Sequence, residues 1–99
     1  MKNLEEKKFN ILRVISKNPY FSQRKISDEL EISLGMVNYC MNELIKKGLV
    51  KIDNFKKNKN KLNYIYVVTP QGIKEKSKLT LNFMKRKMQE YKQLKKEIE

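Results

Sequence analysis

The chain has 99 residues, which is the size of one small domain and leaves little room for a second hydrophobic core. It carries 23 lysines and arginines against 11 acidic residues, and this formal net charge of +12 is typical of proteins that bind a polyanion. With no histidine and the single cysteine Cys40, the sequence excludes an internal disulfide, a multi-thiolate metal site and Cys/His catalysis.

The basic residues are unevenly distributed, which matters because a lysine-rich composition can also reflect solubility or a biased genome. Residues 1–48 hold nine basic and six acidic side chains, whereas residues 49–99 hold fourteen basic and five acidic. The N-terminus is charged and no apolar run approaches the length that spans a bilayer, which argues against a signal peptide or a membrane segment. We therefore expect a soluble, cytoplasmic protein with no membrane partner.

Two helices are predicted in the first thirty residues. Apolar side chains at helical spacing predict a first helix from Leu4 to Ser16, and Asn18-Pro19 stops the pattern. Ser22 is an N-cap candidate for a short second helix, Gln23 to Leu30, because its hydroxyl can accept a hydrogen bond from a free amide of the next turn.

A third helix follows after a short turn. Ser33 is its N-cap candidate, Gly48 is its C-cap, and Ser33 to Lys47 is the expected recognition helix. Two helices joined in this way form a helix-turn-helix, although small helical bundles contain such pairs too. The apolar stripe that should turn inward consists of Val37, Cys40, Met41 and Leu44.

A β-hairpin is predicted next, and it favours the helix-turn-helix interpretation over a plain bundle. Leu49 to Phe55 alternates imperfectly between apolar and polar residues, and Leu62 to Val68 is rich in aromatic and β-branched residues. The stretch between them, Lys56 to Lys61, holds four lysines and no acid, so it is predicted to be a solvated basic wing.

A long fourth helix closes the chain. Thr69 can cap it, Pro70 suits its first position, and no later proline interrupts it before Glu99. At 1.5 Å per residue it would reach roughly 40 Å, more than so small a domain can cover. We expect Ile73 and residues near Leu79 to pack on their own domain and the distal half to form a homodimer through Leu81, Met84, Met88, Tyr91, Leu94 and Ile98.

The predicted fold is therefore mainly helical with a small β-hairpin. Residues 1–72 form a winged helix-turn-helix DNA-binding domain and residues 73–99 form a C-terminal dimerisation helix. The expected partner is double-stranded DNA.

The outward face of the third helix carries the candidate base contacts. Asparagine amides match the donor and acceptor of an adenine edge, methionine can pack on a thymine methyl, and glycine lets the backbone approach closely. An exposed asparagine taken singly is as well explained by solvation, so the prediction rests on the group. Its members are Ser33, Gly35, Met36, Asn38, Tyr39 and Asn42.

Phosphate contacts are expected at two places. The start of the second helix offers free amides and a positive dipole end, and the wing lysines add salt-dependent affinity with little base information. These contacts are Ser22, Gln23, Arg24, Lys56, Lys57, Lys59 and Lys61.

No motif indicates an enzyme or a cofactor. The chain has three glycines, no phosphate-cradling glycine loop, no metal-ligand cluster and no carboxylate pair placed for acid/base work. Cys40 raises the alternative of redox sensing, but its place on the inward stripe favours a small buried packing residue.

Several segments resemble the small MarR-family regulators associated with bacterial exopolysaccharide loci. The likeness runs through Ser22–Ser27, Ser33–Cys40 and Lys47–Lys51, and it continues to Thr69–Ile73 and Phe83–Met88; its most specific part is Ser-Leu-Gly-x-Val-Asn-Tyr at 33–39. The resemblance implies a winged-helix dimer that binds a near-palindromic operator and controls polysaccharide genes. The sequence lacks the extra N-terminal helix of longer members, and its wing has lysines where they often carry an Asp-Arg pair. Their small-molecule pocket is therefore not carried over, and an effector is left open.

Two other functions remain open at this stage. A winged-helix module can use the same basic face to bind RNA or an acidic protein. Alternatively, the long C-terminal helix is the functional element and the domain binds nucleic acid without sequence preference.

Overall fold

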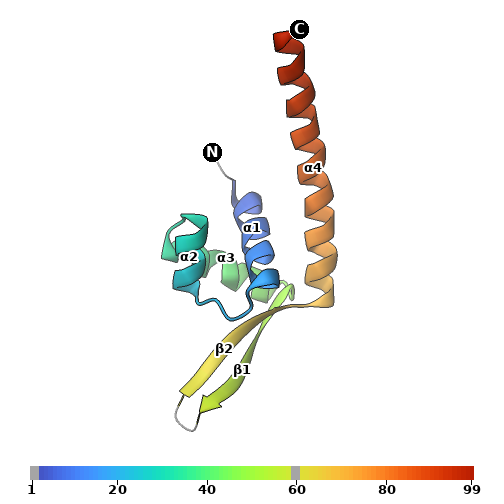
Figure 1. The fold of residues 1–99 in the computed structure, drawn as a ribbon. Helices are drawn as coiled ribbons and strands as arrows, with labels where there is room; N and C mark the ends of the chain where they lie inside the picture. Colours follow the sequence, from blue (N-terminus) through green and yellow to red (C-terminus); the bar gives the residue numbers. More distant parts are fainter. Residues whose placement is uncertain (1–2, 59–60) are drawn as a thin grey trace.

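The computed structural model describes residues 3–58 and 61–99, and it describes side chains outside residues 54–64. Figure 1 shows a mainly helical fold with one antiparallel hairpin, which confirms the predicted fold class. The elements are α1 (Leu4–Lys17), α2 (Gln23–Leu30), α3 (Leu34–Lys46), β1 (Val50–Asn58), β2 (Lys61–Val68) and α4 (Pro70–Ile98).

Each helix begins at a polar side chain that accepts a hydrogen bond from the backbone N–H three residues later. Ser22 accepts from Lys25 at 3.1 Å and Ser33 accepts from Met36 at 3.0 Å. Thr69 plays the same part for α4, and Asn3 does so for α1 at 2.7 Å. These contacts satisfy amide donors that lack a partner within the helix, and they confirm the three caps that the sequence predicts.

The first three helices pack around one core, and the predicted inward stripe of α3 lies at its centre. Val37, Cys40 and Met41 are fully buried, as is Ile26 of α2. One ion pair crosses from α1 to α3, with Lys8 Nζ 3.8 Å from a carboxylate oxygen of Glu43. The other buried core residues are Phe9, Ile11, Leu12, Ile15, Leu44, Leu49 and Val50.

The hairpin is longer than the sequence suggests. Val50 pairs with Val68 and Ile52 with Tyr66, and the ladder continues with a bulge to the pair of Asn58 with Lys61. The basic stretch Lys56–Lys61 therefore belongs largely to the two strands, because backbone pairing propagates without apolar side chains once the register is set. Beside β2, the backbone N–H of Tyr66 donates to the carbonyl of Pro19 at 3.1 Å.

The end of α3 has a specific geometry. Gly48 has a φ of 75°, its N–H donates to the carbonyl of Ile45 at 3.0 Å, and the N–H of Leu49 donates to the carbonyl of Leu44 at 2.9 Å. This pair of bonds is a Schellman motif, in which glycine takes the left-handed conformation without strain. The sequence-based prediction that Gly48 ends α3 is confirmed.

The start of α4 is bonded directly to this end of α3, and we call the contact the α3–α4 joint. The Thr69 N–H donates to the Leu49 carbonyl at 3.0 Å, and the Thr69 hydroxyl donates to the Gly48 carbonyl at 2.6 Å. Gly72 is buried against the same segment, and a Cβ there would overlap the carbonyl oxygen of Leu49. Because that atom belongs to the backbone, it cannot move aside as a side-chain end can.

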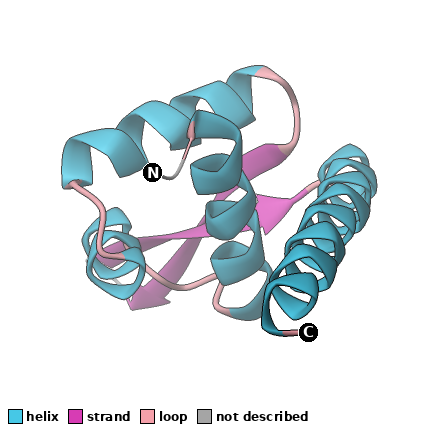
Figure 2. Cartoon of the chain, turned by 90° about the horizontal axis from the view of Figure 1, so that it is seen from above, coloured by secondary structure: helices cyan, strands magenta, loops and turns pink. Residues whose placement is uncertain are grey.

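From this joint α4 runs antiparallel beside α1 and then leaves the domain (Figures 1 and 2). The Phe9 and Phe83 rings are 5.5 Å apart, and every residue from Met84 to the end of the helix is exposed. The molecule consequently measures 64 × 26 × 20 Å. The expectation that Ile73 packs on its own domain is wrong: it is 57% exposed, since Gly72 and Leu79 occupy the side of α4 that faces the domain.

We expect Gly72→Ala to lower the free energy of unfolding by about 1–3 kcal/mol, because the added methyl meets backbone at the α3–α4 joint. Urea denaturation followed by circular dichroism measures the change. Ser77→Ala on the exposed side of α4 is the matched control and should stay within about 0.5 kcal/mol of the wild type. Equal stability of the two variants would contradict the close approach at residue 72.

Candidate nucleic-acid interface

The outer side of α3 is a polar face held by a fully buried inner side. Ser33, Gly35, Asn38 and Asn42 are exposed, and Tyr39 is 50% exposed. A Cβ added at Gly35 would meet only the Ser33 hydroxyl oxygen, at 4.0 Å, so the backbone there is open to a ligand. The structure thus brings together five of the six predicted base-contact residues.

Three side-chain amides and one phenol form a hydrogen-bonded chain across this face, which we call the amide chain. The Asn42 Nδ2 donates to Asn38 Oδ1 at 3.2 Å, and the Asn38 Nδ2 donates to Gln23 Oε1 at 3.2 Å. The Gln23 Nε2 then donates to the Tyr66 hydroxyl oxygen at 3.3 Å. The amide chain therefore joins α3 to α2 and to β2.

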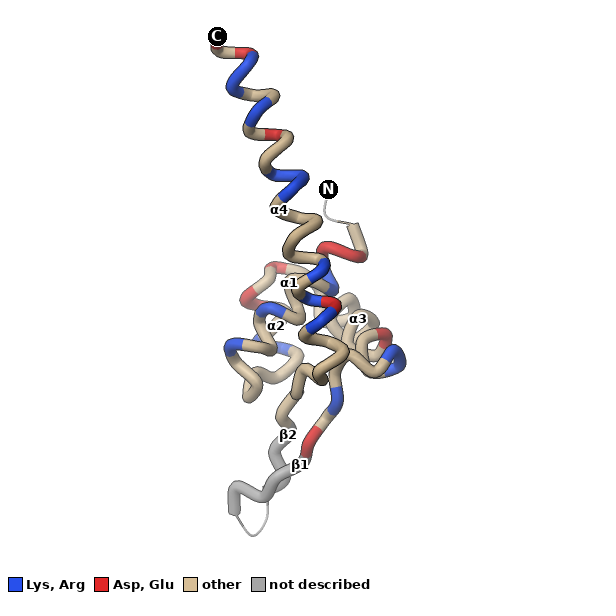
Figure 3. Tube along the Cα trace, turned by 90° about the vertical axis from the view of Figure 1, so that its right-hand side faces the viewer, with Lys and Arg blue, Asp and Glu red and all other residues tan. Residues whose placement is uncertain are grey.

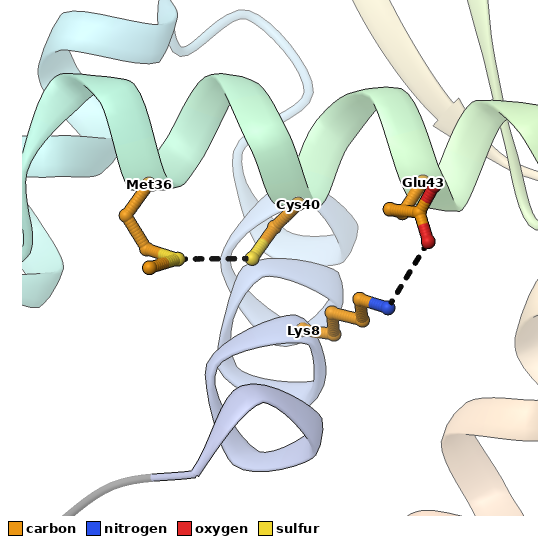
Figure 4. Close-up of polar contacts among 4 residues, drawn as sticks. All are labelled: Lys8, Met36, Cys40 and Glu43. Carbon is orange, nitrogen blue, oxygen red and sulfur yellow. Dashed lines mark hydrogen bonds and ion pairs between the residues drawn. The ribbon is translucent and has the colours of Figure 1, made fainter.

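Met36 departs from the expectation for a base contact. It is half-buried, packs against the core, and lies on the side of α3 that carries Cys40 (Figure 4). The two sulfur atoms are 3.8 Å apart. The reason is helical periodicity, because a residue four positions before a buried one lies on the same side of the helix.

The start of α2 lies beside the polar face. Ser22, Arg24 and Lys25 are exposed there, and the Lys25 ammonium lies 5.7 Å from the centre of the Phe21 ring. Gln23, which the sequence predicts as a phosphate contact, is half-buried and has its amide within the amide chain. One N–H of that amide remains for another acceptor.

The wing lysines cannot be placed in the same detail. Lys56 and Lys57 belong to β1 and Lys61 begins β2, but their side chains lie outside the described residues, as does the whole of Lys59. Their predicted role in phosphate binding stays a prediction.

Two residues of the interface escape analysis of the sequence. Leu34 is 42% exposed at the first position of α3, although its hydrophobicity suggests burial. Tyr66 looks like an ordinary strand residue, and nothing local indicates that its hydroxyl reaches Gln23, which lies 43 residues away in sequence. The presence of two asparagines one turn apart on an exposed helix face is the only sequence signal for the amide chain.

Basic residues also follow α4 beyond the domain (Figure 3). Lys74, Lys78, Lys85, Lys92 and Lys96 are all exposed. Within the described residues no group of three acidic or cysteine side chains is placed to hold a metal ion. Over the same part of the chain, no helix is both long and apolar enough to cross a membrane.

Comparison with known proteins agrees with this geometry. Residues 4–51 match the family described as winged helix-turn-helix DNA-binding. No curated protein matches the sequence. Among solved structures, smu.1704 from Streptococcus mutans is 20% identical with a TM-score of 0.74, and the match covers 87% of this chain and 83% of that one.

Two further structures are described as MarR proteins. The zinc-responsive ZitR of Lactococcus lactis is 18% identical with a TM-score of 0.65, over 89% of this chain and 58% of that one. MarR of Staphylococcus aureus, solved with salicylate and kanamycin, is 22% identical with a TM-score of 0.61, over 82% and 53%. The chain has a MarR-type winged-helix fold. It spans little more than half the length of either of these two proteins.

Cys40 is a packing residue within this fold. It is fully buried, and burial raises the pKa of its thiol, while the cations Lys8 and Lys7 offset only part of the shift. A thiol in this state is both inaccessible and largely protonated at neutral pH.

We therefore expect the native protein to resist alkylation by iodoacetamide at neutral pH, with modification limited by the rate of unfolding. Mass spectrometry of the intact protein over time measures the reaction, and the same protein in urea is the control that should react rapidly. Rapid modification under native conditions would show that Cys40 is accessible and would reopen the redox interpretation.

Proposed function

We propose that this protein is a dimeric transcriptional regulator that binds double-stranded DNA sequence-specifically, with α3 in the major groove. The observation that carries the proposal is the polar face of α3, which has hydrogen-bonding side chains and no acidic residue from Leu34 to Asn42 and is fixed by a buried inner side. The match of residues 4–51 to winged helix-turn-helix DNA-binding domains supports it. DNA places the protein in the cytoplasm.

Base reading is assigned to the residues that are both exposed and able to discriminate. Asn42 keeps its carbonyl oxygen and one N–H, which match the donor and acceptor of an adenine edge. Tyr39 can bond a base or a phosphate, and the exposed Leu34 side chain can pack on a thymine methyl. Met36 is left out of this set because it packs against the core.

Phosphate binding is assigned to the start of α2 and to the wing. Ser22 and Arg24 flank the amide-rich first turn of α2, where the helix dipole favours an anion. The wing extends away from the domain at the end opposite to the free end of α4, so it can reach beyond the groove that α3 occupies (Figure 1). Lys56, Lys57, Lys59 and Lys61 would contact the backbone or the minor groove there.

Dimerisation is assigned to α4. Its apolar stripe is exposed along the whole length of the helix, with Leu81 at 60%, Met84 at 59% and Tyr91 at 63%. Part of the stripe lines a groove of about 710 Å³ whose other wall is α1, including Phe9 and Arg13. An equivalent helix of a second copy would cover both, since a two-fold axis places the same surface on each partner. The exposed Ile73 continues this stripe to the start of α4.

The finer biological assignment is control of exopolysaccharide genes. It is supported by the resemblance of the Ser-Leu-Gly-Met-Val-Asn-Tyr segment at 33–39, and of the segments around it, to regulators of such loci. The corresponding targets would be operators near polysaccharide genes.

Two substitutions separate base reading from phosphate binding. We expect Asn42→Ala to weaken binding to a selected operator about 5- to 100-fold and to leave binding to unrelated duplex DNA unchanged, because a bidentate base contact contributes about 1–3 kcal/mol of discrimination. Arg24→Gln should weaken binding to both duplexes alike and lower the slope of log K against log salt by about 1. Fluorescence anisotropy over a salt series measures both. Equal effects of Asn42→Ala on both duplexes, or on RNA as well as DNA, would favour the interaction-module alternative.

Gly35 tests how closely the backbone of α3 approaches DNA. Gly35→Ala should raise the free energy of unfolding by about 0.5–1 kcal/mol, because alanine is the better helix former and its methyl meets open space. The same variant should bind the operator more weakly, because the methyl occupies the gap between the helix backbone and the base edges. A variant that is more stable and binds the operator as tightly as the wild type would show that no close approach occurs.

The dimer is tested by charge on the apolar stripe. Met84→Glu combined with Met88→Glu should give a monomer in analytical ultracentrifugation, because it buries two unpaired carboxylates between the helices. Gln89→Glu adds charge outside the stripe and is the control that should remain dimeric. If the double variant stays dimeric, the stripe is not the interface.

A further inference from the structure

The amide chain connects the proposed base contacts to the protein core. Its outer end, Asn42 and Asn38, is exposed on α3, whereas its inner end, Gln23 and Tyr66, is half-buried. Tyr66 packs against the core, and its backbone N–H is bonded to Pro19. The inner end is thus held on two sides while the outer end faces the solvent.

We propose that Gln23 and Tyr66 are positioning residues that set the base selectivity of Asn38 and Asn42, an inference that rests on the proposed binding of DNA by α3. Gln23 orients Asn38 directly, Tyr66 orients Gln23, and Asn38 orients Asn42. Selectivity at the α3 face therefore depends on a hydroxyl group on the wing strand that touches no residue of α3.

The argument follows from the chemistry of amides. A terminal amide on an exposed helix rotates about a broad, roughly two-fold torsion and presents its oxygen or its nitrogen almost equally well. Asn38 accepts from Asn42 and donates to Gln23, so reversing it alone would place oxygen against oxygen and nitrogen against nitrogen. One amide can turn only if all of them turn together.

The bonds of the amide chain also leave the groups that base reading needs. An amide has two N–H donors and two oxygen lone pairs. Asn42 uses one donor, and Asn38 uses one donor and one lone pair. Both residues therefore retain a donor and an acceptor for a base edge, already held in one orientation, and binding loses less conformational freedom as a result.

The test measures selectivity separately from affinity. The probes are the duplex that the wild-type protein enriches from a random-sequence pool and the same duplex with its bases shuffled. We expect Gln23→Met and Tyr66→Phe each to reduce the ratio of the two affinities about 3- to 10-fold, the effect of releasing one or two ordered side chains. Affinity for the shuffled duplex should not change, and Tyr66→Phe keeps the ring that packs against the core.

Three further variants separate positioning from stability and from charge. Gln89→Met is the same replacement at an exposed position of α4 and should leave the ratio unchanged. Gln23→Glu keeps an oxygen for Asn38 and can accept from the Tyr66 hydroxyl, so it should preserve the ratio while lowering both affinities through repulsion of phosphate. In an Asn38→Ala background, Gln23→Met should have no further effect on the ratio, because the residue through which it acts is gone.

The outcomes are distinguishable. If the wild type enriches a defined duplex and Gln23→Met and Tyr66→Phe discriminate as sharply as it does, the positioning role is overturned and the DNA-binding function stands. Additive effects of Gln23→Met and Asn38→Ala would also overturn it, because they would show that Gln23 acts independently. A wild type that enriches no duplex overturns the DNA-binding function, and this inference with it.

Discussion

The α3–α4 joint sets the direction of all three functional parts of the molecule. Within a few residues of Gly48 and Leu49 the recognition helix ends, the wing begins and the long C-terminal helix is attached. Thr69 is central to this joint, since its N–H and hydroxyl bond Leu49 and Gly48 while its hydroxyl also caps α4. The missing side chain at Gly72 allows the helix to approach that closely.

This arrangement links dimerisation to DNA geometry in the proposed function. If two α4 helices pair, the angle at each joint determines how far apart and in what orientation the two α3 helices are presented. A palindromic operator has half-sites about one helical turn apart, so an error of a few ångströms at the joint would separate the helices from their grooves. The joint consists of backbone contacts and one short side chain, which makes it less deformable than a contact between long side chains.

Most of the fold is predictable from the sequence because its signals are local. The bounds of α2 agree with the prediction, and Ser22, Ser33 and Thr69 cap the helices as expected, since a cap depends on residues three positions apart. The buried stripe of α3 follows from its period in the same way. The strands extend further than expected because a β-ladder is decided by its partner strand and not by the lysines it contains.

The candidate site is less predictable because it depends on contacts between distant segments. Period alone cannot decide whether a residue at the edge of a helix face packs inward, and Met36 and Ile73 both lie at such an edge. The bond between Asn38 and Gln23 joins residues 15 apart in sequence, and the bond between Gln23 and Tyr66 joins residues 43 apart. No local pattern encodes these pairs; they arise only when α2, α3 and β2 meet.

The measurement that tests the central claim most directly is recovery and sequencing of genomic DNA fragments bound by the purified protein at moderate salt. The account predicts enrichment of a few fragments that share an inverted repeat with half-sites about one helical turn apart. Even recovery of all fragments would contradict it, because a basic domain without base reading binds every duplex alike.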